Sequence, residues 1–164
     1  MSERSDGELK EGLLDTVFDL SRRKHQQTWW PFVGSSMSPY IKAGDMLLVQ
    51  HALDSIRLGD VIVFKCAQGL IAHRVVFIRK HGNCQRVYRT RGDNTRSFDT
   101  PVTQSSVLGR VVCVQKNDKS ISLERPRIRV INFILALLSY AIGILYQTAR
   151  LTKSKALKTN RPID

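Results

Sequence analysis

Three serines stand close together in a stretch that could present a nucleophile. Ser35, Ser36 and Ser38 lie between Gly34 and Pro39. Glycine admits close backbone approaches that other residues resist, and proline fixes its own φ and pushes the residue before it toward an extended conformation. A stiff turn of this kind holds a hydroxyl in one place, as a nucleophile requires. Ordinary Ser/Gly/Pro loops have the same composition, so the turn alone does not identify a reactive serine.

A serine hydroxyl needs a base within hydrogen-bond reach, and the chain has four histidines. His25 and His81 lie in polar stretches. His73 differs, because a two-residue period places it on the same strand face as Ile71 and Val75. We expect a half-buried imidazole there that can accept a proton. The alternative is a core histidine with a structural role only.

Two aspartates could orient this imidazole, as in other Ser-His-Asp enzymes. Asp93 follows Gly92 in an expected tight turn, where an aspartate commonly bonds its own backbone. Asp99 lies six residues later and is freer to reach another side chain. The chemistry of the carboxylate allows either residue.

Three segments, in this order, resemble the catalytic boxes of type I signal peptidases and of the related self-cleaving domains of SOS-type repressors. They are residues 34–45, 73–76 and 91–99, within a resemblance that covers about residues 32–115. The resemblance implies that Ser36, directly before the methionine, is the nucleophile. It implies His73 as general base, as in the endoplasmic-reticulum and archaeal type, whereas most bacterial members use a lysine. It favours Asp99 as the triad acid, with Asp93 shaping the site.

The same resemblance suggests supporting roles for neighbouring residues. Backbone N–H groups near Ser36, together with the Ser35 hydroxyl, would hold the oxyanion. Met37 and Pro39 would contact the substrate, and no metal or cofactor is required. Lys65, the lysine nearest to an apolar run, is the alternative base.

The body of the chain is expected to be mainly β. Short runs rich in β-branched and apolar residues predict strands over residues 46–50, 61–65, 70–79, 86–90 and 107–115. Gly-Asp pairs at 44–45 and 59–60 each introduce a strand. No Gly-rich phosphate loop and no alternation of strands with long helices suggests a nucleotide fold. The resemblance adds that this body is a signal-peptidase-like β-ribbon domain.

Four regions follow from these patterns. Residues 1–27 form an amphipathic helix, because apolar residues recur at helical spacing over 8–24; it would lie on the body or on a membrane interface. Trp29 and Trp30 fit either a membrane interface or the core. The β-rich serine peptidase domain covers residues 28–124, a hydrophobic helix covers 125–147, and a basic, disordered tail covers 148–164.

The hydrophobic helix is the candidate membrane anchor. Residues 130–146 contain no charge in 17 positions, close to the shortest length that spans a bilayer. An interfacial or soluble core helix is the alternative. Small and polar residues share one face that could pack on a partner helix: Asn132, Ala136, Ser139, Gly143 and Gln147. Signal peptidases usually carry their anchor before the serine box, so the order here differs.

The charge distribution favours contact with an anionic membrane over nucleic acid. The net charge is +12, and basic residues flank the apolar run on both sides. Under the positive-inside rule the tail would stay cytoplasmic and the catalytic domain would lie outside, in a single-pass arrangement. The flanking residues are Arg125, Arg127 and Arg129 on one side and Arg150, Lys153, Lys155, Lys158 and Arg161 on the other. The three cysteines, 66, 84 and 113, show neither metal spacing nor a disulfide framework.

We therefore predict a membrane-attached serine endopeptidase that cleaves leader or signal peptides of exported or membrane proteins. Its partners would be a peptide or protein substrate and membrane lipid, with no nucleic acid. One alternative is a dedicated or self-processing protease on the cytoplasmic face. Another is a non-catalytic basic scaffold or nucleic-acid-binding module, which would use Arg86, Tyr88, Arg89, Arg91 and Arg96. The oligomeric state stays open.

Overall fold

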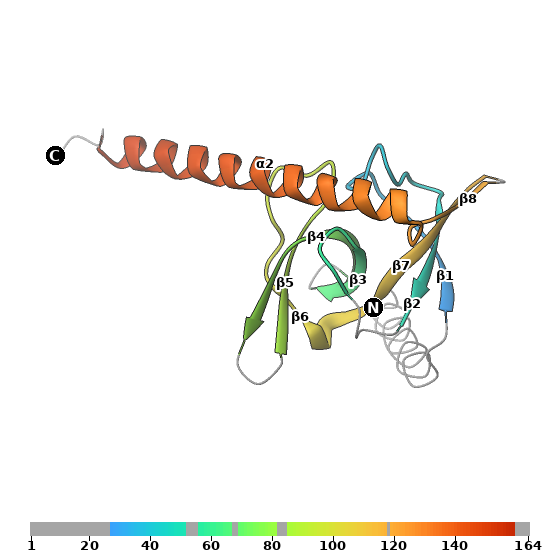
Figure 1. Cartoon of the computed structure of the whole chain (residues 1–164). Coiled ribbons are helices and arrows are strands. Elements are labelled where there is room, and N and C mark those ends of the chain that lie inside the picture. The colour runs from blue at the N-terminus through green and yellow to red at the C-terminus, as the bar shows by residue number, and fades with distance from the viewer. Residues whose placement is uncertain (1–26, 52–55, 67–68, 82–84, 118, 160–164) are drawn as a thin grey trace, which may run out of the picture.

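A computed structural model describes residues 27–51, 56–66, 69–81, 85–117 and 119–159. Eight strands among them form one antiparallel sheet in the order β1-β2-β7-β3-β4-β5-β6, with β8 paired to β7 (Figure 1). The elements are β1 (Gln27–Pro31), β2 (Met46–Gln50), β3 (Val61–Cys66), β4 (Gly69–His81), β5 (Gln85–Arg91), β6 (Val102–Thr103), the short 3-10 helix η1 (Gln104–Ser106), β7 (Val107–Lys116), β8 (Lys119–Ser122) and α2 (Pro126–Thr159). The mainly β fold class with a C-terminal apolar helix is confirmed. The expected helix over residues 1–27 lies outside the described residues, apart from Gln27, which begins β1.

The central strands are buried on both faces. Along β3, Val61 and Val63 belong to one apolar cluster, and Ile62 and Phe64 belong to a second on the opposite face. This explains why β3 reads as a continuous apolar run rather than as an alternating one. The sheet is therefore packed on both sides where it carries β4.

Two matching turns introduce β2 and β3, as predicted. Gly44 has φ 90° and Gly59 has φ 92°, a left-handed backbone that glycine adopts without strain. In each turn the following aspartate accepts a backbone N–H through Oδ2: Asp45 from Lys42 at 2.9 Å, and Asp60 from Arg57 at 2.8 Å. These turns fix where both strands begin.

Helix α2 lies along the body and contacts β4 and β5 (Figure 1). Its small and polar stripe of Asn132, Ala136, Ser139 and Gly143 is buried against the chain's own body, so the expectation of a partner helix for this stripe is corrected. Its residues 126–152 are long and apolar enough to cross a membrane.

The helix also continues to Thr159, and the expectation of a disordered tail from residue 148 is therefore wrong up to that point. The residues from 148 to 159 include alanine, leucine, lysine and arginine, but no glycine or proline. These are good helix formers, so the helix continues past the end of the apolar run.

Candidate active site

The turn that carries Ser36 is held from both ends. The N–H of Phe32 donates to the carbonyl of Asp45 at 2.8 Å, and the N–H of Gly44 donates to the carbonyl of Phe32 at 3.0 Å. Met37 is fully buried in the core directly after the serine. These contacts keep Ser36, which is half-buried, in a fixed position.

His73 and Asp99 are brought together by β4 and by the segment after β5. The imidazole Nδ1 of His73 lies 2.7 Å from Oδ2 of Asp99. Thr90 donates its hydroxyl to the same carboxylate oxygen at 2.7 Å, and the N–H of Asp99 donates to the carbonyl of Thr90 at 3.0 Å. With Nδ1–H donating to the carboxylate, Nε2 of the neutral ring is left as a proton acceptor.

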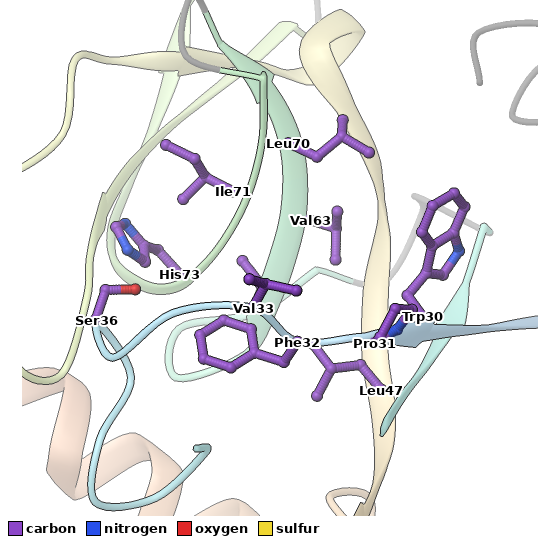
Figure 2. Close-up of a pocket in the computed structure, with 11 residues that line it drawn as sticks. Trp30, Pro31, Phe32, Val33, Ser36, Leu47, Val63, Leu70, Ile71 and His73 are labelled. Atoms are coloured by element: carbon purple, nitrogen blue, oxygen red, sulfur yellow. The ribbon is translucent and has the colours of Figure 1, made fainter. Parts of the chain in front are cut away.

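Ser36 and His73 lie beside each other at one end of an apolar hollow of about 410 Å³ (Figure 2). Gly92 shows how closely they are packed. A Cβ at position 92 would lie 2.6 Å from the carbonyl oxygen of Ser36 and 2.9 Å from Nε2 of His73. The N–H of Asn94 donates to that same carbonyl at 2.7 Å. The segment after β5 therefore contacts both the serine turn and the acceptor nitrogen of the histidine.

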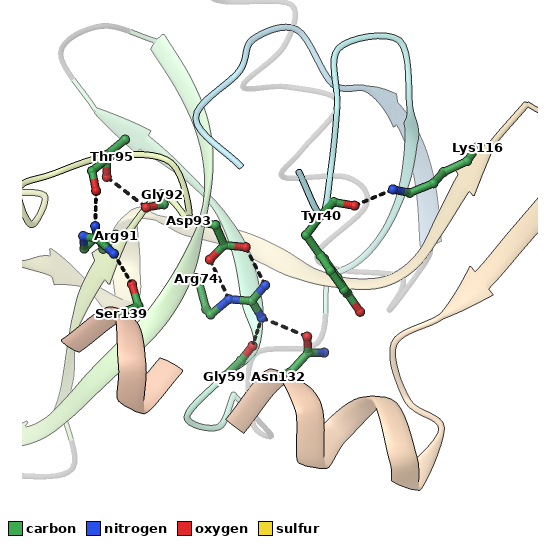
Figure 3. A network of polar contacts seen from close by, with 10 residues as sticks. All are labelled: Tyr40, Gly59, Arg74, Arg91, Gly92, Asp93, Thr95, Lys116, Asn132 and Ser139. Carbon is green, nitrogen blue, oxygen red and sulfur yellow. Dashed lines mark hydrogen bonds and ion pairs between the residues drawn. The ribbon is translucent and has the colours of Figure 1, made fainter. Parts of the chain in front are cut away.

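Asp93 has a different partner from Asp99. It forms a two-bond ion pair with Arg74, from Nε to Oδ1 at 2.8 Å and from Nη2 to Oδ2 at 2.7 Å (Figure 3). The side chain of Arg74 is fully buried, and its Nη1 donates to the carbonyl of Gly59 and to Oδ1 of Asn132, both at 2.9 Å. Asp99 thus contacts His73, whereas Asp93 forms an ion pair with the buried Arg74. The catalytic roles of both aspartates stay predictions.

Arg91 is buried, although the sequence analysis places it in a basic surface patch. Its Nη1 donates to the hydroxyl of Ser139 at 2.6 Å, and its Nη2 donates to the carbonyl of Thr95 (Figure 3). Burial lowers the pKa of Arg91, and the nearby Asp93 and Asp99 act in the opposite direction. Because Tyr88 and Arg91 are both buried, the five-residue basic and aromatic patch expected of a nucleic-acid-binding module is corrected: these two do not lie on the surface.

Other predicted site residues occupy different places. Met37 is fully buried, so its assignment to substrate binding is corrected. Pro39 is exposed and lines a separate hollow with Tyr40 and Lys116, where Lys116 Nζ donates to the carbonyl of Tyr40 at 2.5 Å; its contact with the substrate stays a prediction. Ser35 is exposed, and its carbonyl accepts the N–H of Ser38 at 3.1 Å. The oxyanion role of its hydroxyl stays a prediction.

The alternative base and the two tryptophans are also placed. Lys65 is exposed on β3 and is not among the residues that line the hollow. Trp30 lines the hollow and packs against the core, whereas Trp29 is exposed on the other face of β1. The strand alternation therefore separates the two rings, and Trp30 belongs to the site.

Comparison with known proteins identifies the superfamily. The family described as Peptidase S24-like matches residues 5–112, more than half of the chain. The chain belongs to the Peptidase S24-like family. Ser36, His73 and Asp99 all fall inside the matched range, and α2 falls outside it. Membership supports a peptidase or self-cleaving domain of the serine type. None of the curated proteins matches the chain.

Proposed function

We propose that this S24-like protein is a serine endopeptidase with Ser36 as nucleophile, His73 as general base and Asp99 as the orienting acid. The 2.7 Å contact between His73 Nδ1 and Asp99 Oδ2, beside Ser36, is the observation that carries the proposal. Ser36 Oγ attacks the scissile carbonyl while Nε2 takes its proton. The imidazolium then protonates the leaving amine, and water releases the acyl-enzyme by the same route.

The sheet next to His73 offers a place for an extended substrate. Residues 69–73 of β4 pair with β3, but the pairing of β4 with β5 begins only at Arg74. The other edge of this short segment therefore borders the hollow, where a substrate strand can add to the sheet through its backbone. The hollow is lined mostly by apolar side chains, including Phe32, Val63 and Ile71. Such a site favours apolar residues next to the cleaved bond, as in the leader or signal peptides of exported and membrane proteins.

Attachment to a membrane is the second part of this proposal. It is supported by the apolar surface of α2 and by the basic residues on both sides of its apolar run. A single-pass arrangement with the body outside would need α2 to be free of the body. In that arrangement the bonds from Arg74 to Asn132 and from Arg91 to Ser139 would be broken.

Labelling with a fluorophosphonate tests the catalytic part. We expect covalent labelling at Ser36 in the full-length protein, and none in Ser36→Ala or His73→Ala. Ser38→Ala is the matched control and should label normally. Ser35→Ala should label, with peptide turnover reduced by about 100- to 1000-fold if its hydroxyl supports the oxyanion. Absence of labelling in a folded wild-type protein would contradict the proposal and favour a non-catalytic module.

Cleavage of a mixed peptide library, read by mass spectrometry, tests the substrate class. We expect cuts after an apolar or small residue in extended, apolar peptides. Intact-mass measurement of the incubated protein covers the self-processing alternative, which the S24-like match supports equally. Cleavage of the chain itself, absent in Ser36→Ala and without any library cleavage, would replace the proposal with self-processing.

A further inference from the structure

Helix α2 has two faces of different character. The inner face is buried: Asn132, Ala136 and Ser139 are at most 5% exposed. The outer face leaves large apolar side chains 37–67% exposed, namely Val130, Ile131, Phe133, Ile134, Leu137, Leu138, Ile142, Leu145, Tyr146 and Leu151. A continuous apolar surface of this length is unusual in contact with water and marks an interaction site.

Polar bonds from buried arginines fasten the inner face to the body. Arg74 donates to Asn132 at 2.9 Å, and Arg91 donates to Ser139 at 2.6 Å. Further along, a Cβ at Gly143 would lie 2.2 Å from the ring of Phe98. If α2 moved into lipid by itself, Asn132 and Ser139 would lose these partners in hydrocarbon, and both arginines would lose acceptors in the protein. Each such loss is costly.

While α2 is docked, the part of it that is free of the body is too short to span a membrane. Contacts with the body extend from Ile128 to Gly143, a distance of about 22 Å at 1.5 Å per residue. Between Gly143 and Arg150, only six residues remain before the first charge, and a span needs about 20 residues. While α2 is docked, the body therefore covers one side of the apolar segment, and this segment cannot be surrounded by lipid.

The ends of the outer face carry positive charge. Arg125, Arg127 and Arg129 precede it, and Arg150 lies near its far end. At its start, Arg57 and Arg129 line a hollow of about 390 Å³ together with Asp60, Val130 and Phe133, so two guanidinium groups face one carboxylate there. Guanidinium groups beside apolar side chains match a lipid phosphate above its acyl chains.

We propose that α2 stays docked and lies in the plane of an anionic lipid membrane, with its outer face in the acyl boundary and its arginines among the headgroups. Charge complementarity selects this occupant, because a second copy of the chain would bring the same arginines to the interface. The proposal stands independently of catalysis. It places the body on the same side of the membrane as the end of α2.

Cysteine labelling on vesicles tests this placement. The full-length Ser36→Ala protein, with its three native cysteines replaced by alanine, is added to preformed vesicles of phosphatidylcholine with or without phosphatidylglycerol. Single cysteines are placed at Thr152, near the end of α2, and at Ser105, on the body; both positions are exposed. We expect an impermeant maleimide added outside to label both positions on phosphatidylglycerol vesicles. Protection of position 152 alone would show a spanning helix and overturn the proposal.

Charge and apolar variants, measured by vesicle flotation, test the contact itself. Replacing Arg125, Arg127 and Arg129 with glutamine should weaken binding to phosphatidylglycerol vesicles about 100-fold, since each arginine near an anionic surface contributes a factor of about five. The matched control replaces three arginine or lysine residues of the β4–β5 hairpin, namely Arg79, Lys80 and Arg86, and should bind as before. Leu138→Glu with Ile142→Glu should abolish binding.

Folding of each variant is checked by its melting temperature, and self-association by its sedimentation in detergent-free buffer. Equal binding of the arginine variant and its control would overturn the proposal. The proposal would also be overturned if the wild-type protein bound neither kind of vesicle and sedimented as a dimer, because a second copy would then cover the outer face.

Discussion

Gly92→Ala should damage the active site without adding or removing any reacting group. The new methyl would lie 2.6 Å from the carbonyl oxygen of Ser36, 2.8 Å from Cγ2 of Thr95 and 2.9 Å from Nε2 of His73. Ordinary van der Waals contact begins near 3.4 Å, so the serine carbonyl must move away by about 0.8 Å. That carbonyl also accepts the N–H of Asn94, which restricts how the turn can yield.

The expected loss follows from this displacement. A misplacement of about 1 Å can cost about 100-fold in rate, so kcat/KM should fall roughly 10- to 100-fold. Peptide cleavage and the rate of fluorophosphonate labelling should fall together, because both depend on the distance between the serine hydroxyl and the imidazole. Both are measured well below the melting temperature of the variant.

Gly44→Ala is the matched control. Nothing lies within 4 Å of a Cβ there, but φ is +90°, so alanine costs about 1–2 kcal/mol in backbone strain. Its melting temperature should fall while kcat/KM of the folded protein is retained, because alanine keeps the N–H that donates to the carbonyl of Phe32. If Gly92→Ala keeps kcat/KM within about twofold of wild type, the tight arrangement of Ser36, Gly92 and His73 inferred from these contacts is refuted.

Three further substitutions separate the acids of the body. Asp99→Asn should keep the fold but lower kcat by about 10⁴-fold, because an amide that donates to the imidazole stabilises the wrong tautomer. Steady-state kinetics measure kcat and a thermal melt checks the fold. A folded variant with normal turnover would contradict the prediction. Asp93→Asn should mainly destabilise the protein, by about 3 kcal/mol in chemical denaturation, because it breaks the ion pair of the buried Arg74; a stable but inactive variant would contradict the assignment. Burial raises the pKa of Asp60, and the hydrogen bond from the Arg57 N–H opposes this rise. The native state therefore binds the proton of Asp60 more tightly than the unfolded chain does. As a result, the free energy of unfolding falls as the pH rises above about 4. In Asp60→Asn the amide oxygen still accepts that N–H, so the melting temperature should rise at about pH 7 but not in acid. An equal change in melting temperature at both pH values would contradict the reasoning.

Local sequence patterns predict β2, β3, β4, β5 and β7, but they do not predict β1, β6 and β8 as strands. The two-residue alternation in β4 sends His73 toward the site, and the Gly-Asp turns set the starts of β2 and β3. The choice of Asp99 over Asp93 came from a family resemblance and from the turn expected after Gly92. In the structure that segment does bring the later carboxylate to the imidazole.

The errors arose where a residue's partner is remote in the sequence. The resemblance implies that Met37 contacts the substrate, but its side chain fills the core. Arg91 is expected in the basic patch of the alternative nucleic-acid-binding module, yet its side chain is buried and its acceptor Ser139 lies 48 residues later. The role of α2 is a different case: an apolar helix has the same composition whether a bilayer surrounds it or a protein covers one face, so its length and composition allow a spanning role without establishing it. Only the tertiary contacts show which face is covered.

The strand period also explains how α2 supports the site. Successive residues of a strand point to opposite faces, so His73 faces Ser36 while Arg74 faces Asn132. Arg91 directly precedes Gly92, and Phe98 directly precedes Asp99; these two contact Ser139 and Gly143 of the same helix. Each catalytic segment is thus held from behind by α2. Removing the helix would take away the acceptors Asn132 and Ser139 and would expose the two guanidinium groups to water. The docked helix is therefore part of what positions the proposed triad, and a membrane that held α2 in its plane would also hold the candidate active site next to the lipid surface.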